Sequence, residues 1–355
     1  MSAPVQVQTG ATGGRRGDVL LRAIDVTKHF PVGRGRPGRA RPVVHAVDGV
    51  SLEVLAGETL GVVGESGCGK STLGRCLTRL TDLTSGYVEI DGRDVSRLSR
   101  RQLRPVRRDV QMVFQDPYAS LNPRRRVGDI VAEPLLVQGH GDAAAVARRV
   151  RELFDVVGLA ASHADRFPHE FSGGQRQRVG IARALAMSPK LLVADEPVSA
   201  LDVSIQAQVL NLFSDLQDEL GLTYVFIAHD LGVVRHVSDR IAVMYLGHLV
   251  EVADADALYD APAHPYTEAL LSAAPDLDDG SDVVRRQRIV LTGDVPNPVD
   301  RPSGCPFRTR CPFAQEVCAQ QRPPLAEVAP GRFTACHFPR VDAAGAPVAG
   351  AVTAR

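Results

Sequence analysis

Apolar residues along the chain occur in short runs that alternate with stretches of helical spacing. Four runs, each bounded by polar or turn residues, predict strands buried on both faces: 59–63, 110–114, 191–194 and 224–228. Between the last two runs, residues 204–220 carry apolar side chains at helical intervals. This alternation predicts an α/β fold with a largely parallel sheet.

Changes in amino-acid composition and in the predicted elements along the chain indicate its domain organisation. The main α/β domain spans residues 19–259, and its helix-rich part, residues 116–187, indicates an inserted helical subdomain. From residue 260 to 340 the chain is rich in proline and short elements, which predicts a small C-terminal appendage. Residues 1–18 and 341–355, dominated by small and polar residues, predict flexible tails.

Charge and hydropathy exclude several classes of protein. The 355 residues include 41 Lys and Arg and 41 Asp and Glu, and this balance argues against coating nucleic acid or anionic lipid through bulk charge. The arginine-rich run at 33–42 contains no acid and predicts a solvated loop. The longest apolar stretch, residues 241–246, is much too short to span a membrane, which takes about 18 residues. The N-terminus lacks the apolar run of a secretion signal. We therefore expect a cytosolic chain with reduced thiols.

A phosphate-binding motif follows the first predicted strand. Its residues are Gly64, Glu65, Ser66, Gly67, Cys68, Gly69, Lys70, Ser71 and Thr72, which fit the pattern G-x-x-x-x-G-K-[ST]. The glycines let backbone N–H groups turn inward around a β-phosphate, and the start of the next helix, expected to reach Leu80, adds partial positive charge. Lys70 would bridge the β- and γ-phosphates of ATP, and Ser71 would ligate Mg²⁺.

Two carboxylates end the strand predicted at 191–194. Asp195 is placed to hold Mg²⁺, directly or through water, and Glu196 could polarise a water molecule for attack on the γ-phosphorus. An acidic pair after a strand is a weak signal by itself. Together with the phosphate-binding motif it indicates nucleotide hydrolysis.

Residues 171–178 narrow the class of nucleotide hydrolase. They read Phe-Ser-Gly-Gly-Gln-Arg-Gln-Arg and lead into a helix predicted at 177–186. Ser172 and the N–H groups of Gly173 and Gly174 would form an anion site at a helix start. The segment resembles the LSGGQ signature of ATP-binding cassette (ABC) ATPases, with Phe171 in place of leucine and Gln175 as its glutamine. Since the chain also has its own phosphate loop, this second anion site indicates a dimer whose subunits complete each other's ATP sites.

Further positions match the ABC family in order. The resemblance implies a P-loop ATPase domain with an antiparallel β subdomain beside the parallel-sheet core. It assigns Gln115 to the Q-loop, whose glutamine reaches the Mg²⁺ or the attacking water, and His229 to the switch histidine that contacts the γ-phosphate. Ser199 and Asp202 fit the D-loop, which lies against the partner's phosphate site. Phe30 fits the aromatic residue that stacks on adenine, with a core position as the alternative.

Longer segments of the chain resemble one subfamily of the ABC ATPases. Residues 115–124, 264–271, 304–307 and 310–312 resemble segments of peptide and nickel importers. The chain is similar to the ATP-binding subunit of a dipeptide or oligopeptide ABC importer, of the second-subunit (F) type. The resemblance implies a motor peripheral to the cytoplasmic face of the membrane, paired with a second ABC ATPase subunit in a heterodimer. Its other implied partners are two membrane permeases and an extracytoplasmic substrate-binding protein.

Alternative functions stay open at this point. The substrate could be nickel, an opine or a sugar, because the permeases and the binding protein choose it. A soluble ABC ATPase without a transport role is a competing class, but such chains usually carry a coiled-coil insertion or a second cassette, and this sequence has neither. The complete set of Lys70, Asp195, Glu196 and His229 argues against a binding-only module. We expect no nucleic-acid partner.

Four cysteines gather near the C-terminus. Cys305, Cys311, Cys318 and Cys336 lack the paired C-x2-C spacing of a zinc ribbon. Disulfides do not fit a reducing cytosol, whereas inert buried thiols are an alternative. Four thiolates in a segment too small for its own core favour a metal centre, and the two Cys-Pro pairs favour a [4Fe–4S] cluster over Zn²⁺.

Overall fold

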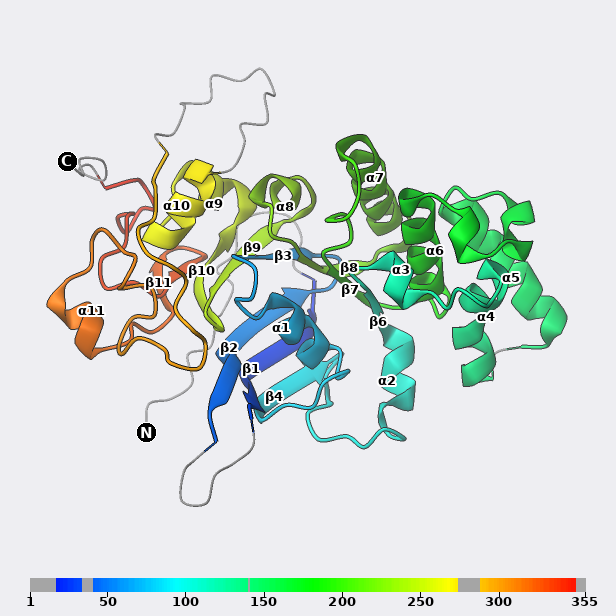
Figure 1. Ribbon diagram of the computed structural model, residues 1–355, viewed down its shortest axis with the longest axis horizontal. Helices are drawn as coiled ribbons and strands as arrows, with labels where there is room; N and C mark the ends of the chain where they lie inside the picture. The colour runs from blue at the N-terminus through cyan, green and yellow to red at the C-terminus, as the bar shows by residue number, and fades with distance from the viewer. Residues whose placement is uncertain (1–16, 34–40, 140, 274–287, 349–355) are drawn as a thin grey trace. The chain divides into compact units, whose positions relative to one another are not determined.

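The chain folds into two compact units, whose elements are labelled in Figure 1. The computed structural model describes residues 17–33, 41–139, 141–273 and 288–348. The first unit comprises Met1–Val54, Leu60–Ser96 and Ala228–Arg355, and the second unit comprises Leu55–Thr59 and Arg97–Ile227. Most of the predicted N-terminal tail (1–16), the centre of the arginine-rich run (34–40) and residues 349–355 lie outside the described residues.

The first unit contains a four-stranded sheet with one buried face. Its strands follow the order β2-β1-β4-β5, with bounds β1 Val19–Pro31, β2 Val43–Leu55, β4 Ser85–Ile90 and β5 Arg93–Asp94. Along β2, buried Val50, Leu52 and Val54 alternate with partly exposed residues, because successive side chains on a strand point to opposite faces. The antiparallel pairing of β4 with β1 and β5 agrees with the expected antiparallel β subdomain.

A second set of strands in the first unit leads into the phosphate-binding motif. The order is β11-β12-β10-β9-β3, with bounds β3 Thr59–Val63, β9 Arg240–Tyr245, β10 His248–Asp254, β11 Ala326–Ala329 and β12 Arg332–Thr334. β3 runs parallel to β9, whereas the other neighbours are antiparallel. Because β11 and β12 come from the predicted C-terminal appendage, that region is built into the same sheet as β3.

Among the described residues, five helices of the first unit lie between or after its strands in the sequence. They are α1 Lys70–Leu77, α8 Leu231–Val237, α9 Ala255–Asp260, α10 Pro265–Ala273 and α11 Glu316–Gln320. Helix α1 ends before the predicted Leu80, because Arg79 has a φ of 53° that no α-helix can continue. The Arg79 side chain is anchored there by donating to the Val95 carbonyl at 2.8 Å.

The second unit confirms the predicted parallel strands and the long helix. Its strands follow the order β8-β7-β6, with bounds β6 Val110–Val113, β7 Leu191–Asp195 and β8 Thr223–Ile227, all parallel. Helix α7, Val203–Leu220, ends at Gly221, whose φ is 64°. The Phe213 ring of this helix packs edge-on against Tyr224 and Phe226 of β8, with ring centroids 5.6 Å apart in both pairs.

Between β6 and β7 the regular structure of the described residues is entirely helical. It comprises α3 Pro117–Ser120, α4 Val127–Gln138, α5 Ala143–Val156, the 3-10 helices η1 Ala161–Asp165 and η2 Pro168–Glu170, and α6 Gly173–Leu185, while α2 Leu103–Asp109 precedes β6. The compact unit is larger than the predicted helical subdomain, because it also contains three strands. Over the described ranges, no helix combines the length and the apolar character needed to cross a membrane.

A polar network ties the C-terminal region to β2. Arg301 donates to the Asp48 carboxylate at 2.7 Å and to Nε2 of His248 at 2.9 Å. Because arginine can only donate, Nε2 of His248 accepts, and its Nδ1–H donates to the Asp48 carbonyl at 2.7 Å. Burial, together with the positive charges of Arg322 and Arg301, lowers the pKa of His248 to about 4. The network therefore holds a neutral imidazole.

Three side chains in and beside this network lie close enough together to bind a metal ion. Ligand atoms of His29, His45 and Asp48 all lie within 4.8 Å of one another. The Arg301 guanidinium already binds the Asp48 carboxylate, and its positive charge opposes a cation at this position. We therefore interpret these residues as part of an ion-pair network.

The C-terminal tail begins later than the sequence predicts. Val341, only 5% exposed, packs with Ala261 and Ala263 and forms an isolated bridge with Pro347. The prediction of a tail from residue 341 is thus wrong for residues 341–348. A single valine among small residues is a weak sequence signal, and only the folded chain supplies the apolar surface that buries it.

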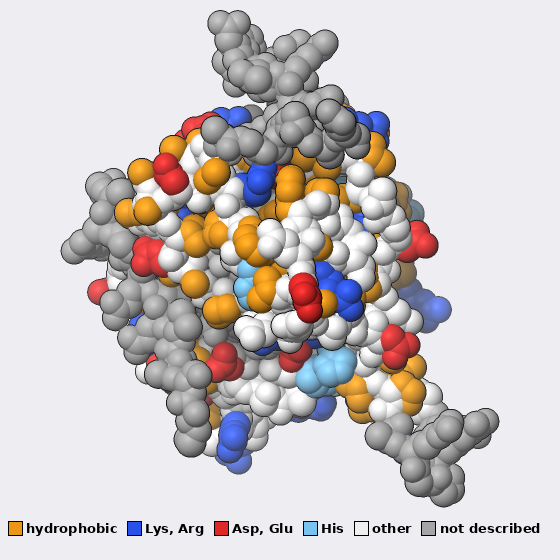
Figure 2. Space-filling view, turned by 90° about the vertical axis from the view of Figure 1, so that its left-hand side faces the viewer, with side chains coloured by type: hydrophobic (Ala, Val, Ile, Leu, Met, Phe, Trp, Pro, Cys, Tyr) orange, Lys and Arg blue, Asp and Glu red, His pale blue; other side chains and the backbone are white. Residues whose placement is uncertain are grey.

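Charges of both signs are interspersed on the surface. Figure 2 shows the face turned toward the viewer by a 90° rotation of Figure 1. Among the described side chains of this face, Lys and Arg lie near Asp and Glu, with no broad patch of one sign. This distribution agrees with the zero net charge of the chain and with binding through shaped surfaces.

We predict that His248 makes the stability of the protein sensitive to mild acid. The native pKa of about 4 lies below the about 6.5 of an unfolded imidazole, so the stabilisation is complete above pH 6.5 and is lost as the pH falls toward 4. The His248→Gln variant keeps one donor and one acceptor but cannot titrate. Urea denaturation between pH 7 and 5 should give a shallower loss of stability for this variant, by up to about 1.4 kcal/mol per pH unit. His236→Gln, at an exposed position, is the control, and equal slopes in all three proteins would contradict the prediction.

Candidate functional site

The phosphate-binding motif forms a tight loop between β3 and α1. Gly64 has a φ of 152° and Gly69 a φ of 111°, both in a region that side chains rarely adopt. A β-carbon at Gly64 would lie 2.1 Å from the Met244 carbonyl oxygen, and one at Gly69 would lie 1.9 Å from that of Ala46. The two glycines are therefore required by backbone packing from β9 and β2 as well as by the turn itself.

Lys70 points into this loop. Its side chain is buried, and Nζ donates to the carbonyl oxygens of Gly64 at 2.6 Å and Glu65 at 3.1 Å. Cys68 is also buried, and this burial raises the pKa of its thiol. Ser66 and Gly67 at the crown of the loop are exposed, so the loop opens toward solvent at the position where phosphate oxygens would enter.

The other predicted site residues of the first unit lie at the ends of strands. Phe30 near the end of β1 is 40% exposed, and the Lys28 ammonium lies 4.9 Å from its ring centroid. This exposure excludes the alternative that Phe30 is a core residue. His229 is exposed and directly follows the buried Ala228, and the next residue, Asp230, caps α8 by accepting from the Gly232 N–H at 2.7 Å.

In the second unit the structure brings Gln115 and Glu196 together. The Gln115 amide donates to the Glu196 carboxylate at 2.9 Å. Glu196 has a φ of 47°, which is uncommon for a residue with a side chain, and its N–H is held by the Ile227 carbonyl at 2.8 Å. Asp195 before it is buried at the end of β7. Strain of this kind persists where the surrounding structure fixes it, often at functional sites.

The signature segment forms the start of α6. Ser172 Oγ accepts from the Gln175 N–H at 3.3 Å, and the Gln175 side chain accepts from the Ser172 N–H at 3.0 Å, a capping box. A β-carbon at Gly174 would lie 2.4 Å from Ile205 of α7. A β-carbon at Gly173 would lie 3.2 Å from Leu201, so the D-loop segment packs against the signature. Ser199 Oγ donates to the Glu196 carbonyl at 3.1 Å.

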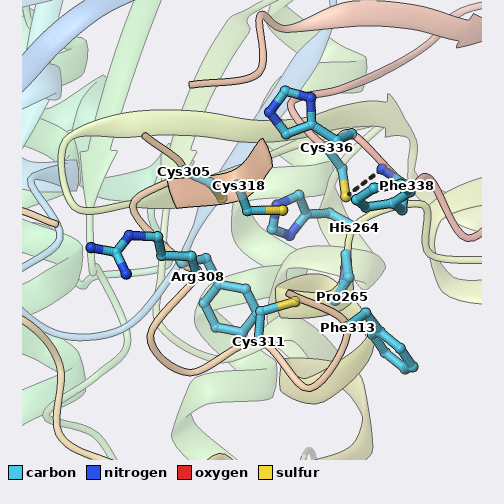
Figure 3. Close-up of a pocket in the computed structure, with 11 residues that line it drawn as sticks. His264, Pro265, Cys305, Arg308, Cys311, Phe313, Cys318, Cys336 and Phe338 are labelled. Atoms are coloured by element: carbon cyan, nitrogen blue, oxygen red, sulfur yellow. Dashed lines mark hydrogen bonds between the residues drawn. The ribbon is translucent and has the colours of Figure 1, made fainter. Parts of the chain in front are cut away.

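Four cysteines line one cavity of the first unit, shown in Figure 3. The cavity is also lined by aromatic rings, among them Phe307, and burial raises the pKa of Cys311 to about 11 and of Cys336 to about 12. Among the described residues, the three-membered groups with all ligand atoms within 4.8 Å of one another do not include these cysteines. A tetrahedral zinc site needs sulfur atoms about 3.8 Å apart, so the sulfur atoms are more widely spaced than one zinc ion requires.

Sequence reasoning assigned no role to two residues that reach the phosphate loop. Arg310 pairs with the Glu65 carboxylate at 2.7 Å, and the Tyr266 hydroxyl accepts from the Glu65 N–H at 2.9 Å. Both residues lie in segments that resemble importer sequences, but nothing in their local pattern indicates the loop as their partner. The contact joins residues more than 200 positions apart, so only the tertiary structure reveals it.

Comparisons with known proteins identify the families of the α/β domain and of the C-terminal region. A family model described as "ABC transporter" matches residues 47–199, and one described as "Oligopeptide/dipeptide transporter, C-terminal region" matches residues 250–318. The oligopeptide transport ATP-binding protein AppF of Bacillus subtilis (strain 168) is 54% identical over 90% of this chain and 98% of its own length. The di/tripeptide transport ATP-binding protein DppF of Pseudomonas aeruginosa (strain UCBPP-PA14) is 52% identical over 90% of this chain and 98% of its own length.

Solved structures agree with the sequence matches. The ATP-binding cassette MJ0796, in a dimeric post-hydrolysis state bound to ADP and Pi, superimposes with a TM-score of 0.60 and 31% identity. The match covers 66% of this chain and 99% of that one. The cassette fold therefore accounts for about two thirds of the present chain, and the C-terminal region extends beyond it.

Proposed function

The chain belongs to the family of ATP-binding subunits of oligopeptide and dipeptide ABC transporters, and we propose that it hydrolyses ATP to drive peptide uptake through a membrane importer. The observation that carries this proposal is the 54% identity to an oligopeptide transport ATP-binding protein across 90% of the chain. The match to the transporter C-terminal region supports peptides over an opine or a sugar. It also argues against a soluble ABC ATPase without a transport role.

The phosphate loop is the proposed binding site for the phosphates of ATP. Lys70 already lies inside the loop with its ammonium directed at two carbonyl oxygens, and it would exchange these for β- and γ-phosphate oxygens. Phe30 offers an exposed ring for adenine. The sequence assigns Mg²⁺ to Ser71, Gln115 and Asp195, and the ion would neutralise charge that develops on the phosphates.

Glu196 is the proposed general base. Its carboxylate accepts from Gln115, so the amide can hold both the base and an attacking water in place. The base takes a proton from the water as the oxygen attacks the γ-phosphorus, and ADP and phosphate leave. His229, from its sequence position, would contact the γ-phosphate.

A dimer would complete each ATP site. Ser172, Gly173, Gly174 and Gln175 form a helix start suited to an anion, and the related cassette MJ0796 is dimeric. We propose that the signature and the D-loop serve a nucleotide on the partner subunit. The partner is a second, different ABC ATPase subunit, and both would dock on two permeases at the cytoplasmic face of the membrane, with an extracytoplasmic binding protein delivering peptide.

The four cysteines are the proposed ligands of a [4Fe–4S] cluster. Cys305, Cys311, Cys318 and Cys336 converge on one cavity, and no three of their sulfur atoms lie within 4.8 Å of one another, which favours a larger metal centre over a single zinc ion. When bound, the cluster would cross-link the segment around Cys305, Cys311 and Cys318 to Cys336 after β12. Zn²⁺ and inert thiols are the alternatives.

We predict that Glu196→Gln abolishes turnover but keeps ATP binding. Loss of a general base should slow steady-state ATP hydrolysis by about 10²- to 10⁴-fold, because the amide cannot take the proton. Binding of a fluorescent ATP analogue should stay near the wild-type affinity, since the phosphate loop is unchanged. Glu219→Gln, at an exposed position of α7, is the matched control. Wild-type turnover of Glu196→Gln would rule out the assigned role.

We predict that membrane partners accompany the chain. Affinity purification from detergent-solubilised membranes of its natural host should recover two permeases and a second ABC ATPase, which mass spectrometry would identify. Addition of a peptide substrate should raise ATP hydrolysis by the recovered complex. Recovery with DNA-bound or ribosomal proteins alone would overturn the transport proposal.

We predict that anaerobically purified protein is brown and contains about four iron and four sulfide per chain. Cys318→Ser should lose the colour and the iron, because a serine oxygen is a poor ligand for the cluster. Cys76→Ser, a buried thiol outside the cavity, should keep both. One zinc per chain without iron would support the zinc alternative, and metal-free protein would support inert thiols.

A further inference from the structure

The phosphate loop is held from outside the cassette by an arginine. Arg310 donates through Nη1 to Oε2 of Glu65 at 2.7 Å and through Nη2 to Oε1 at 3.0 Å. The guanidinium fork thus binds both oxygens of the carboxylate, the strongest geometry for such a pair. The Arg310 side chain is 8% exposed and that of Glu65 26%, so solvent screens this ion pair only partly.

A second anchor holds the backbone of the same residue. The Tyr266 hydroxyl accepts from the Glu65 N–H at 2.9 Å. Tyr266 is fully buried, and its ring packs on Tyr245 and Phe307 with centroids 4.7 and 5.4 Å apart. Such a packed ring has little freedom to move its hydroxyl.

The helix that carries Tyr266 is itself fixed to the sheet. The buried Glu251 carboxylate of β10 accepts from the N–H groups of Ala263 at 2.7 Å and His264 at 2.8 Å. The Tyr266 N–H donates to Nδ1 of His264 at 3.0 Å. Hydrogen bonds to β10 therefore fix the start of this helix and, through His264, the backbone of Tyr266.

All three functional groups of Glu65 are thus occupied. Its N–H binds Tyr266, its carboxylate binds Arg310, and its carbonyl accepts from Lys70 Nζ. A carboxylate in a phosphate-binding loop would repel a polyphosphate, and the paired guanidinium compensates that charge. The same pairing fixes the carbonyl that positions the Lys70 ammonium.

We propose that Arg310, together with Tyr266, is a positioning residue for ATP binding, because it holds Glu65 and through it the phosphate loop in the conformation that receives the phosphates. The proposal rests on the proposed role of this loop and extends it to the C-terminal region. Arg310 lies directly before Cys311, and its N–H donates to the Phe307 carbonyl at 3.0 Å. Order around the four cysteines is therefore transmitted to the nucleotide site through one ion pair.

The test compares Arg310→Ala, Arg310→Lys, Glu65→Gln and the Arg310→Ala/Glu65→Gln double variant in the full chain. Binding of a fluorescent ATP analogue should weaken about tenfold in Arg310→Ala, and less in Arg310→Lys, which keeps the charge but loses the fork. KM for ATP should rise by a similar factor with kcat little changed. The double variant should bind better than Arg310→Ala, because it removes the uncompensated carboxylate. Arg322→Ala, an exposed arginine of the same region, is the control.

The reaction of Cys68 with a thiol reagent reports on the loop directly. Cys68 is buried in the native loop, so its alkylation, followed by peptide mass spectrometry, should be slow in the wild type and several-fold faster in Arg310→Ala. Faster alkylation together with weaker ATP binding supports the proposal. If Arg310→Ala does not fold, the graded effect of Arg310→Lys decides instead.

Two other outcomes separate the inference from its premise. Wild-type ATP affinity and slow Cys68 alkylation in a folded Arg310→Ala or Arg310→Lys variant would overturn the positioning role while leaving the ATPase proposal intact. Failure of the wild-type chain to bind ATP would instead overturn the proposed function of the loop, and the positioning role with it.

Discussion

The shape of the phosphate loop is the constraint on which the first unit depends. Two backbone carbonyls, of Met244 and Ala46, occupy the space that β-carbons at Gly64 and Gly69 would need. The close approach of β9 and β2 therefore requires glycine at both positions of the loop. The Lys70 ammonium lies inside this packed loop, so the proposed phosphate site would need little rearrangement to receive a nucleotide.

The C-terminal region contacts both the phosphate loop and the sheet that leads into it. Its hairpin of β11 and β12 continues the sheet that contains β3. Arg301 joins the network of Asp48 and His248 on β2 and β10, and Arg310 reaches Glu65 in the loop itself. Both arginines make their ion pairs with limited exposure to water, so solvent screens these pairs less than it screens surface pairs. The proposed positioning role of Arg310 would link this region to the nucleotide site.

The second unit combines rigid packing with local strain. A β-carbon at Gly174, at the start of α6, would lie 2.4 Å from Cγ2 of Ile205, so a larger residue would force that side chain to shift, and Ser172 and Gln175 cap each other. Glu196 is held with a positive φ by hydrogen bonds to its backbone, and its carboxylate meets Gln115. In its proposed role of general base, a carboxylate that is already oriented would need no rearrangement when water and nucleotide bind.

The elements and the chemistry that depend on neighbouring residues could be predicted from the amino-acid sequence. Buried strands, the glycine-rich loop with Lys70, and the signature at Ser172 are local patterns, because hydrophobic periodicity and helix caps act over a few residues. The sequence did not indicate the burial of Val341 or a partner for Arg310 or Tyr266. Those contacts form only when the chain folds, and folding also brings the four cysteines to one cavity. Contacts between residues more than 200 positions apart depend on how sheets and helices pack. The local sequence around each of these residues does not indicate its partner.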